Sequence, residues 1–274
     1  MGGAPFSATA RVPDRLGRYA LGVVITVVAV LSQYFVPQLG APARAVYGTL
    51  AGDVAVVYGI PVVAFALLIG AGPLRNWKDR MGRAAIEGLS WYGLLSLLGL
   101  AVLVVLVIIY EAVDPGALAL LNRPNPALTQ AASDPWFYVG FSFAVGAFEE
   151  TIFRGWIFGF WRDRRVAWVV PAVGSSVLFA GMHLYYATTY AAAAPLIFPG
   201  LFLIGFAFAA TYRASGGNLV VIAFLHGAHD AAAYYTLINP VGGEIAYYLV
   251  ILVAAVVGGV YFLSKREDTV LAPI

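Results

Sequence analysis

The stretch FEETIFRGW, residues 148–156, places two carboxylates and a guanidinium in a run that is otherwise apolar. The flanking residues extend this run to about 136–161, which is long enough for a helix that crosses a bilayer. A charged side chain at the centre of a membrane helix costs about 2.5 to 3.5 kcal/mol on an insertion scale. Glu149, Glu150 and Arg154 therefore mark an intramembrane site, and we expect their partners elsewhere in the chain.

The composition of the whole chain favours a polytopic membrane protein. Of 274 residues, 61% are hydrophobic and 11% are charged, whereas a soluble domain carries roughly 25% charged residues. Cysteine is absent, which excludes disulfides, thiol nucleophiles and iron–sulfur clusters. The net charge of +2 comes without a basic tract, so we expect no nucleic-acid partner. The excess of arginine over lysine indicates a prokaryotic source.

Apolar runs predict an all-α fold with eight transmembrane helices, the active site lying inside the helical bundle. No long hydrophilic stretch interrupts these runs, so residues 1–274 are predicted to form a single integral-membrane domain with no soluble domain. The motif-bearing core is expected at about 136–238. The predicted spans are 18–37, 53–72, 89–110, 136–161, 166–188, 195–212, 218–238 and 244–263.

The placement of arginine and lysine predicts that both termini are cytoplasmic, in the plasma or inner membrane. With the N-terminus inside, thirteen basic residues fall on the inner side and only Arg44 and Arg123 on the outer side. Such an excess sets the orientation of membrane proteins. The inner residues are Arg11, Arg15, Arg18, Arg75, Lys78, Arg80, Arg83, Arg162, Arg164, Arg165, Arg213, Lys265 and Arg266.

Three segments outside the spans carry weaker signals. APARA at 41–45 resembles a signal-peptide cleavage site, but the preceding apolar run is longer than the apolar region of a usual signal peptide, which favours a retained anchor. Residues 112–135 form the long outer loop, of a length typical of lids or mobile segments. Residues 74–90 are basic and partly amphipathic, and are expected either along the inner membrane surface or as a solvated loop.

Ionisable residues within the spans concentrate in three helices. The fourth span carries Glu149, Glu150 and Arg154, the fifth carries His183, and the seventh carries the other two histidines of the chain with an aspartate. Intramembrane charges are rare and usually face a bundle interior or a wet cavity. This distribution predicts one site built from three helices.

Helical geometry separates the two glutamates. Residues four apart stand about 40° apart around the helix axis, so Glu150 and Arg154 are placed to form an ion pair. The acidic residue is N-terminal, which is the better order. Glu149 stands about 100° away, outside that pair. We therefore expect Glu149 to be the carboxylate available for chemistry.

The same spacing recurs in the two histidine-bearing helices. His226 and Asp230 are four residues apart, so Asp230 can orient His226 or accept its ring proton. Phe179 and His183 are also four apart. A structural alternative is that these groups only hold helices together, but interhelical polar contacts contribute only about 0.6 to 2 kcal/mol. That gain does not offset the cost of so many charges, which favours function over structure.

These residues resemble the motifs of the CPBP family, the CAAX protease and bacteriocin-processing enzymes, also called Abi proteins. The family motifs are Glu-Glu-x-x-x-Arg, Phe-x-x-x-His and His-x-x-x-Asn/Asp. Here they stand at Glu149–Arg154, Phe179–His183 and His226–Asp230, in the family order and in separate helices. The first 110 residues carry no such motif.

The resemblance implies an intramembrane glutamic endopeptidase that acts on membrane-associated, prenylated or leader-bearing proteins without a cofactor. Glu149 would activate the water, and His183 would hold and polarise it. His226 and Asp230 would face the oxyanion, with Glu150 and Arg154 as a supporting pair. The eukaryotic members look to have Asn where this chain has Asp230. An ionised Asp cannot donate a hydrogen bond, so Asp230 would be protonated or would only orient His226, with His229 as a stand-in donor.

Two other functions fit the same residues. His183, His226 and a carboxylate could bind Zn²⁺ in a metalloprotease, although the His-Glu-x-x-His signature is missing. Intramembrane Glu, Arg and His residues also build proton relays, so a proton-coupled transporter or a scaffold is the third alternative. The sequence shows no paired broken helices or internal repeat of the transporter kind.

Overall fold

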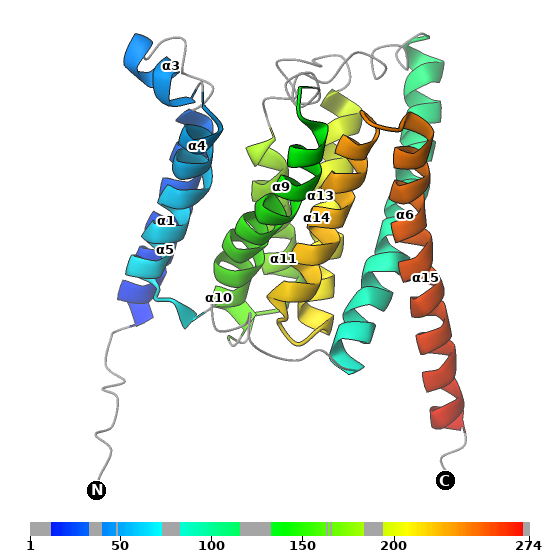
Figure 1. Ribbon diagram of the computed structural model, residues 1–274. Helices are drawn as coiled ribbons and strands as arrows, with labels where there is room; N and C mark the ends of the chain where they lie inside the picture. Colours follow the sequence, from blue (N-terminus) through cyan, green and yellow to red (C-terminus); the bar gives the residue numbers. More distant parts are fainter. Residues whose placement is uncertain are drawn as a thin grey trace, which may run out of the picture. The chain divides into compact units, whose positions relative to one another are not determined.

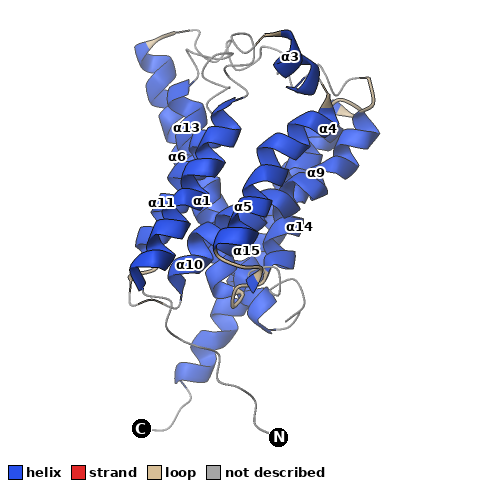
Figure 2. Ribbon diagram, turned by 90° about the vertical axis from the view of Figure 1, so that its left-hand side faces the viewer, coloured by secondary structure: helices blue, strands red, loops and turns tan. Residues whose placement is uncertain are grey.

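The computed structural model describes residues 12–32, 40–47, 49–72, 83–115, 133–162, 164, 166–183 and 194–270. Within these ranges the chain is helical with short turns and contains no β-strand (Figure 2). The all-α prediction is confirmed for this part of the chain. Much of the predicted outer loop at 112–135 and of the basic segment at 74–90 lies outside the described residues, as do several of the basic residues that set the predicted orientation.

The chain forms two compact units, Met1–Gly72 and Pro73–Ile274. The first unit contains α1 packed against α5 and η2, and a glycine makes this packing close: a Cβ on Gly22 would lie 2.6 Å from the ring of Phe65, which is fully buried. Its elements are α1 (Val12–Ser32), α3 (Ala41–Tyr47), α4 (Leu50–Asp53), the π-helical η2 (Val54–Gly59) and α5 (Ile60–Leu68). The single-domain prediction for residues 1–274 stays a prediction.

The second unit is a bundle of long helices (Figure 1). In it, α9 packs along α14, α6 packs along both α13 and α15, and α11 packs along α13. Its elements are α6 (Arg83–Val113), α9 (Pro135–Glu150), the π-helical η4 (Thr151–Phe158), α10 (Gly159–Arg162), α11 (Val169–Met182), α13 (Ala194–Ala214), α14 (Leu219–Tyr235) and α15 (Pro240–Val270).

Local sequence signals set where α9 and α14 begin. Asp134 caps α9 by accepting a hydrogen bond from the backbone N–H of Phe137, and Pro135 occupies the first helical position. Asn218 caps α14 through the N–H groups of Val220 and Val221. Just before it, Gly216 and Gly217 adopt φ of 71° and 87°, conformations that glycine tolerates well. This turn ends α13 and starts α14.

Two glycines allow α9 and α14 to touch backbone to backbone. A Cβ on Gly146 would lie 2.8 Å from the carbonyl oxygen of Ala223 and from the nitrogen of Gly227. A Cβ on Gly227 would lie 2.6 Å from the Cα of Phe143. Small residues are what allow such close approach in membrane bundles. The close contact lies within one turn of the acidic pair on α9 and of His226 on α14, so it brings these side chains together.

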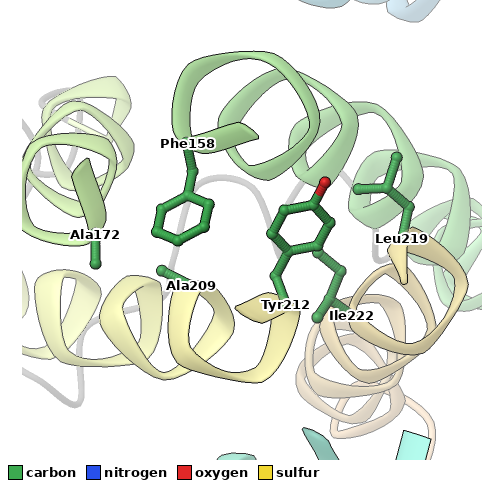
Figure 3. Packing of buried hydrophobic residues seen from close by; sticks show 6 residues of the cluster. All are labelled: Phe158, Ala172, Ala209, Tyr212, Leu219 and Ile222. Carbon is green, nitrogen blue, oxygen red and sulfur yellow. The ribbon is translucent and has the colours of Figure 1, made fainter. Parts of the chain in front are cut away.

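A buried cluster joins η4, α11, α13 and α14 (Figure 3). The rings of Phe158 and Tyr212 meet edge to face at 5.8 Å. Ala172 and Ala209 provide the small surfaces that let α11 and α13 approach these rings. The members are Phe158, Ala172, Ala209, Tyr212, Leu219 and Ile222, each at most 1% exposed. This cluster fixes one end of η4 against three helices.

The outward faces of several helices are apolar, as expected for contact with lipid. Among the described residues, five helices are long and apolar enough to cross a membrane: 15–32, 51–68, 85–113, 195–214 and 241–261. A shorter apolar helix lies at 169–182. Each of the eight predicted spans overlaps a described helical segment, but the count of eight crossings and the N-in/C-in orientation stay predictions.

Candidate active site

The acidic pair lies where the helix changes its geometry. Glu149 and Glu150 are the last two residues of α9, and the chain continues without a break into the π-helix η4. All eight residues of η4 are buried. Short π-helical segments inside α-helices are rare and occur frequently at functional sites. The widened turn therefore marks the same position that the charges mark.

Glu150 and Arg154 form the ion pair that their spacing predicts. The Nη1 atom of Arg154 donates to the Oε1 atom of Glu150 at 2.9 Å, and both side chains are 0% exposed. The Nη2 atom of Arg154 also donates to the backbone carbonyl of Gly205 on α13. These hydrogen bonds offset part of the cost of burying the two charges, and the Oε2 atom of Glu150 and the Nε atom of Arg154 have no hydrogen-bond partner among the described residues. The pair thus ties η4 to α13.

Aromatic rings surround the Arg154 guanidinium. Its Cζ atom lies 4.9 Å from the ring centre of Phe179, 5.4 Å from that of Phe208 and 5.9 Å from that of Phe153. A cation near ring faces is stabilised by the ring quadrupole, more so when the cation is desolvated. This cage offsets part of the cost of placing the guanidinium in an apolar interior.

His226 links both glutamates to Asp230. Its Nδ1 atom lies 2.8 Å from the Oε1 atom of Glu150, so the ring donates to that carboxylate. Its Nε2 atom lies 3.4 Å from the Oδ2 atom of Asp230 and 3.8 Å from the Oε2 atom of Glu149. The predicted contact between His226 and Asp230 is present. The side chain of Asp230 is 30% exposed, whereas that of His226 is 5% exposed.

His183 lies at the C-terminal end of α11. Its Nδ1 atom is 2.9 Å from the carbonyl oxygen of Phe179, to which it can only donate, so in a neutral imidazole the Nε2 atom is the acceptor. The Phe179 ring lies 5.1 Å from the His183 ring and 5.7 Å from the His226 ring. The Phe179 ring thus contacts both histidine rings of the predicted site.

His229 lies on another part of the α14 surface. Its ring packs against Tyr247 of α15 at 4.6 Å between centroids. That His229 donates a hydrogen bond to the oxyanion in place of Asp230 stays a prediction.

Two features of the site were missed by sequence reasoning. Glu150 was assigned to Arg154 alone, whereas its Oε1 atom also accepts from His226. Residues Gly205 and Phe208 of α13 contact the site, although the apolar sequence of this helix gives no signal that would single them out. Helical spacing reports contacts within one helix, and these contacts join different helices.

Within the part of the chain that the structure describes, no group of three His, Asp or Glu side chains is arranged to hold a metal ion. The zinc alternative, with His183, His226 and a carboxylate as ligands, stays a prediction. The side chains that the geometry does bring together are carboxylates, an imidazole and a guanidinium.

Comparison with known proteins covers the same part of the chain. Residues 131–232 match the family model of the type II CAAX prenyl endopeptidase Rce1-like proteins. These residues belong to the Rce1-like family. The Rce1-like segment contains α9, η4, α11, α13 and most of α14, with every predicted site residue, so the family resemblance is confirmed there. The segment is less than half of the chain.

No curated protein and no solved structure matches the chain. The apolar helices point to a multi-pass membrane protein, and its residues 131–232 are similar to a family of proteases.

Proposed function

We propose that the chain is an intramembrane endopeptidase in which Glu149 activates a water molecule to hydrolyse a peptide bond of a membrane-associated protein. The observation that carries the proposal is the position of His226, whose Nδ1 atom binds Glu150 while its Nε2 atom faces Glu149 and Asp230. Glu150 and Glu149 thereby contact different nitrogens of one imidazole, and we assign them different roles.

Glu150 is a poor candidate for the base because its Oε1 atom already accepts hydrogen bonds from Arg154 and His226. Those donors stabilise its ionised form and hold it in place. Glu149 is 4% exposed and contacts His226 at the longer distance of 3.8 Å. A general base needs hydrogen-bond reach to its water, directly or through one further water. We therefore assign the base to Glu149 and a supporting role to Glu150.

The proposed reaction starts when Glu149 takes a proton from water and the oxygen bonds to the carbonyl carbon of the substrate. The carbonyl oxygen becomes an oxyanion that needs nearby hydrogen-bond donors. The Nε2–H of a protonated His226 supplies one donor, and a protonated Asp230 supplies another. When the C–N bond breaks, the proton held by Glu149 passes to the leaving amine. His183 polarises the water through its Nε2 atom.

The charges of the cluster support this assignment. If all three are ionised, Glu149, Glu150 and Asp230 carry three negative charges, and Arg154 carries one positive charge. An apolar interior disfavours such an excess of negative charge. A second proton on the His226 ring, which makes it cationic, and one proton on Asp230 would make the cluster neutral. That arrangement removes the difficulty raised by an aspartate at position 230, since a protonated carboxyl can donate a hydrogen bond.

The remaining assignments are part of the proposal. Eight spans with both termini inside would place the site within the bilayer of a prokaryotic inner membrane. Substrates would be prenylated polypeptides, as the family description suggests, or leader-bearing or otherwise membrane-anchored ones. The catalytic chemistry needs no cofactor.

The test uses the purified full chain in liposomes with a library of membrane-anchored peptides, read by mass spectrometry for new termini. Wild type is expected to cleave a subset of the library, and Glu149→Gln is expected to cleave none. Glu87→Gln is the matched control, because Glu87 lies on α6 and accepts a hydrogen bond from Tyr261. Equal cleavage by wild type and Glu149→Gln would overturn the proposal. Proton flux without peptide products would favour the transporter.

A further inference from the structure

Phe208 of α13 lies against the imidazole that the proposed reaction uses. The ring centres of Phe208 and His226 are 4.8 Å apart and the two planes differ by 21°, which is a stacked arrangement. Phe208 is 1% exposed. Offset stacking at this distance is a favourable geometry for aromatic rings. The contact therefore fixes the plane of the His226 ring.

Phe208 is itself held by its neighbours. Tyr92 of α6 stacks on it at 5.7 Å with an interplanar angle of 8°, and Tyr92 is fully buried. Phe179 meets it edge to face at 6.5 Å. Tyr92 and Phe208 also belong to one buried cluster with Leu225 of α14 and Ala254 of α15. The ring is thus set between four helices and cannot turn without disturbing them.

The same ring contacts both partners of Glu150. The guanidinium carbon of Arg154 lies 5.4 Å from the Phe208 centre, and the imidazole of His226 stacks on it. Glu150 in turn accepts hydrogen bonds from these two residues. Phe208 therefore packs against both hydrogen-bond donors, Arg154 and His226, and Glu150 accepts hydrogen bonds from both.

Two constraints are needed to hold an imidazole in one orientation. The hydrogen bond from Nδ1 to Glu150 fixes which nitrogen points toward the end of α9, but the ring can still tilt about that bond. A ring stacked on its face removes the tilt. With both constraints, the Nε2 atom stays directed at Asp230 and Glu149, at 3.4 Å and 3.8 Å.

We propose that Phe208 is a positioning residue that holds the His226 imidazole with Nδ1 on Glu150 and Nε2 toward Glu149 and Asp230, with Tyr92 as the ring that supports it. The kinetic consequence rests on the proposed endopeptidase function. The structural consequence does not.

The kinetic test compares Phe208→Leu with Phe206→Leu. Phe206 lies on the same helix and packs against Trp168 at 5.8 Å, so it is the same substitution at a different contact. Loss of orientation at a reacting group is expected to lower kcat of Phe208→Leu by about 10- to 100-fold with little change in KM. Phe208→Tyr keeps a stacking ring and is expected to recover most of kcat. An unchanged kcat in Phe208→Leu, or an equal loss in Phe206→Leu, would overturn the proposal.

A spectroscopic test does not depend on activity. The chain is labelled with ¹⁵N-histidine in detergent micelles, and the His226 ring signals are assigned from their loss in His226→Gln. Phe208→Leu is expected to shift or broaden these signals, and Phe206→Leu to leave them in place. Unshifted His226 signals in Phe208→Leu would contradict the proposal even if the peptidase is active. Shifted signals in a chain without peptidase activity would refute the proposed function and keep the positioning role.

Tyr92→Leu covers the case in which Phe208→Leu does not fold. It removes the supporting ring without touching the imidazole, so the same His226 signals should shift in the same direction and kcat should fall by about 3- to 10-fold, as for a small misplacement. Unmoved signals and unchanged kcat in this variant would also overturn the proposal.

Discussion

The two π-helical segments among the described residues share a pattern and differ in their surroundings. Each directly follows an acidic residue within an apolar helix: η2 follows Asp53, and η4 follows Glu150. In η2 only Val57 of the six residues is buried, and Asp53 is partly exposed. In η4 all eight residues are buried, and Glu150 is bonded to Arg154 and His226.

The difference teaches that an acid beside a widened helical turn does not make a site by itself. At η4, side chains from α9, α11, α13 and α14 converge on the acid, and small residues bring the helices close enough for contact. Neutralising charge and hydrogen bonds then support one another in an apolar interior. We therefore expect substitutions at η4 to affect activity and stability, and a substitution beside η2 to leave activity unchanged.

The largest expected difference is in catalysis. Glu149→Ala is expected to lower kcat/KM by about 10²- to 10⁴-fold, the range for loss of a general base. Asp53→Ala, beside η2, is expected to leave kcat/KM unchanged. The measurement is steady-state cleavage of an identified peptide in liposomes. A comparable loss in both variants would mean that the two acids share a function.

The next effect is on stability. Arg154→Met is expected to destabilise the fold by about 3 to 5 kcal/mol, because it leaves Glu150 as a buried charge without its cation. The double variant Arg154→Met/Glu150→Gln should recover part of this loss. Denaturant unfolding in micelles measures both. If the single variant is as stable as wild type, the pair at η4 does not support the fold.

The sequence predicted the contacts within single helices at this site. The spacing of Glu150 with Arg154 and of His226 with Asp230 was sufficient, because four residues bring side chains onto one helix face. The family motifs located the helices that meet. Apolar runs located the helical segments, since a bilayer requires about 20 apolar residues per span.

The sequence could not predict the contacts between helices. The bond from His226 to Glu150 depends on the close approach of Gly146 and Gly227, and nothing in the pattern distinguishes these glycines from others in the chain. The stack of Phe208 on His226 depends on the rotation of α13. When a helix is apolar on every face, its sequence does not indicate which face points toward the site.

A smaller effect is expected at the contact between α9 and α14. Gly146→Ala would place a Cβ 2.8 Å from backbone atoms of α14, which should cost about 1 to 3 kcal/mol, as overpacking does. It should also lower activity by moving Glu149 away from His226. Gly140→Ala is the control on the same helix, since no atom lies within 4 Å of its added Cβ. Equal stability of the two variants would show that α9 and α14 can separate freely.

A modest effect is expected at Asp230. Asp230→Asn keeps the side-chain shape and supplies an N–H donor, so kcat is expected to fall by no more than about tenfold. Asp230→Ala removes the contact with His226 and should cause the larger loss. Steady-state rates of the two variants measure this order. The reverse order would show that the negative charge, and not a donor, is needed at this position.

The smallest expected effect is that of a metal chelator. In the proposed mechanism the base and the donors are protein side chains, so chelation should leave the cleavage rate unchanged, and elemental analysis should find less than one zinc per chain. Loss of activity on chelation, restored by Zn²⁺ alone, would favour the metalloprotease.

The most direct test of the central claim compares membrane proteomes of cells that express wild type, Glu149→Ala or Glu87→Gln, with new polypeptide termini identified by mass spectrometry. The account predicts that one set of termini appears with wild type and Glu87→Gln and is missing with Glu149→Ala, whose uncleaved precursors accumulate. The same termini at the same abundance in Glu149→Ala membranes would contradict it.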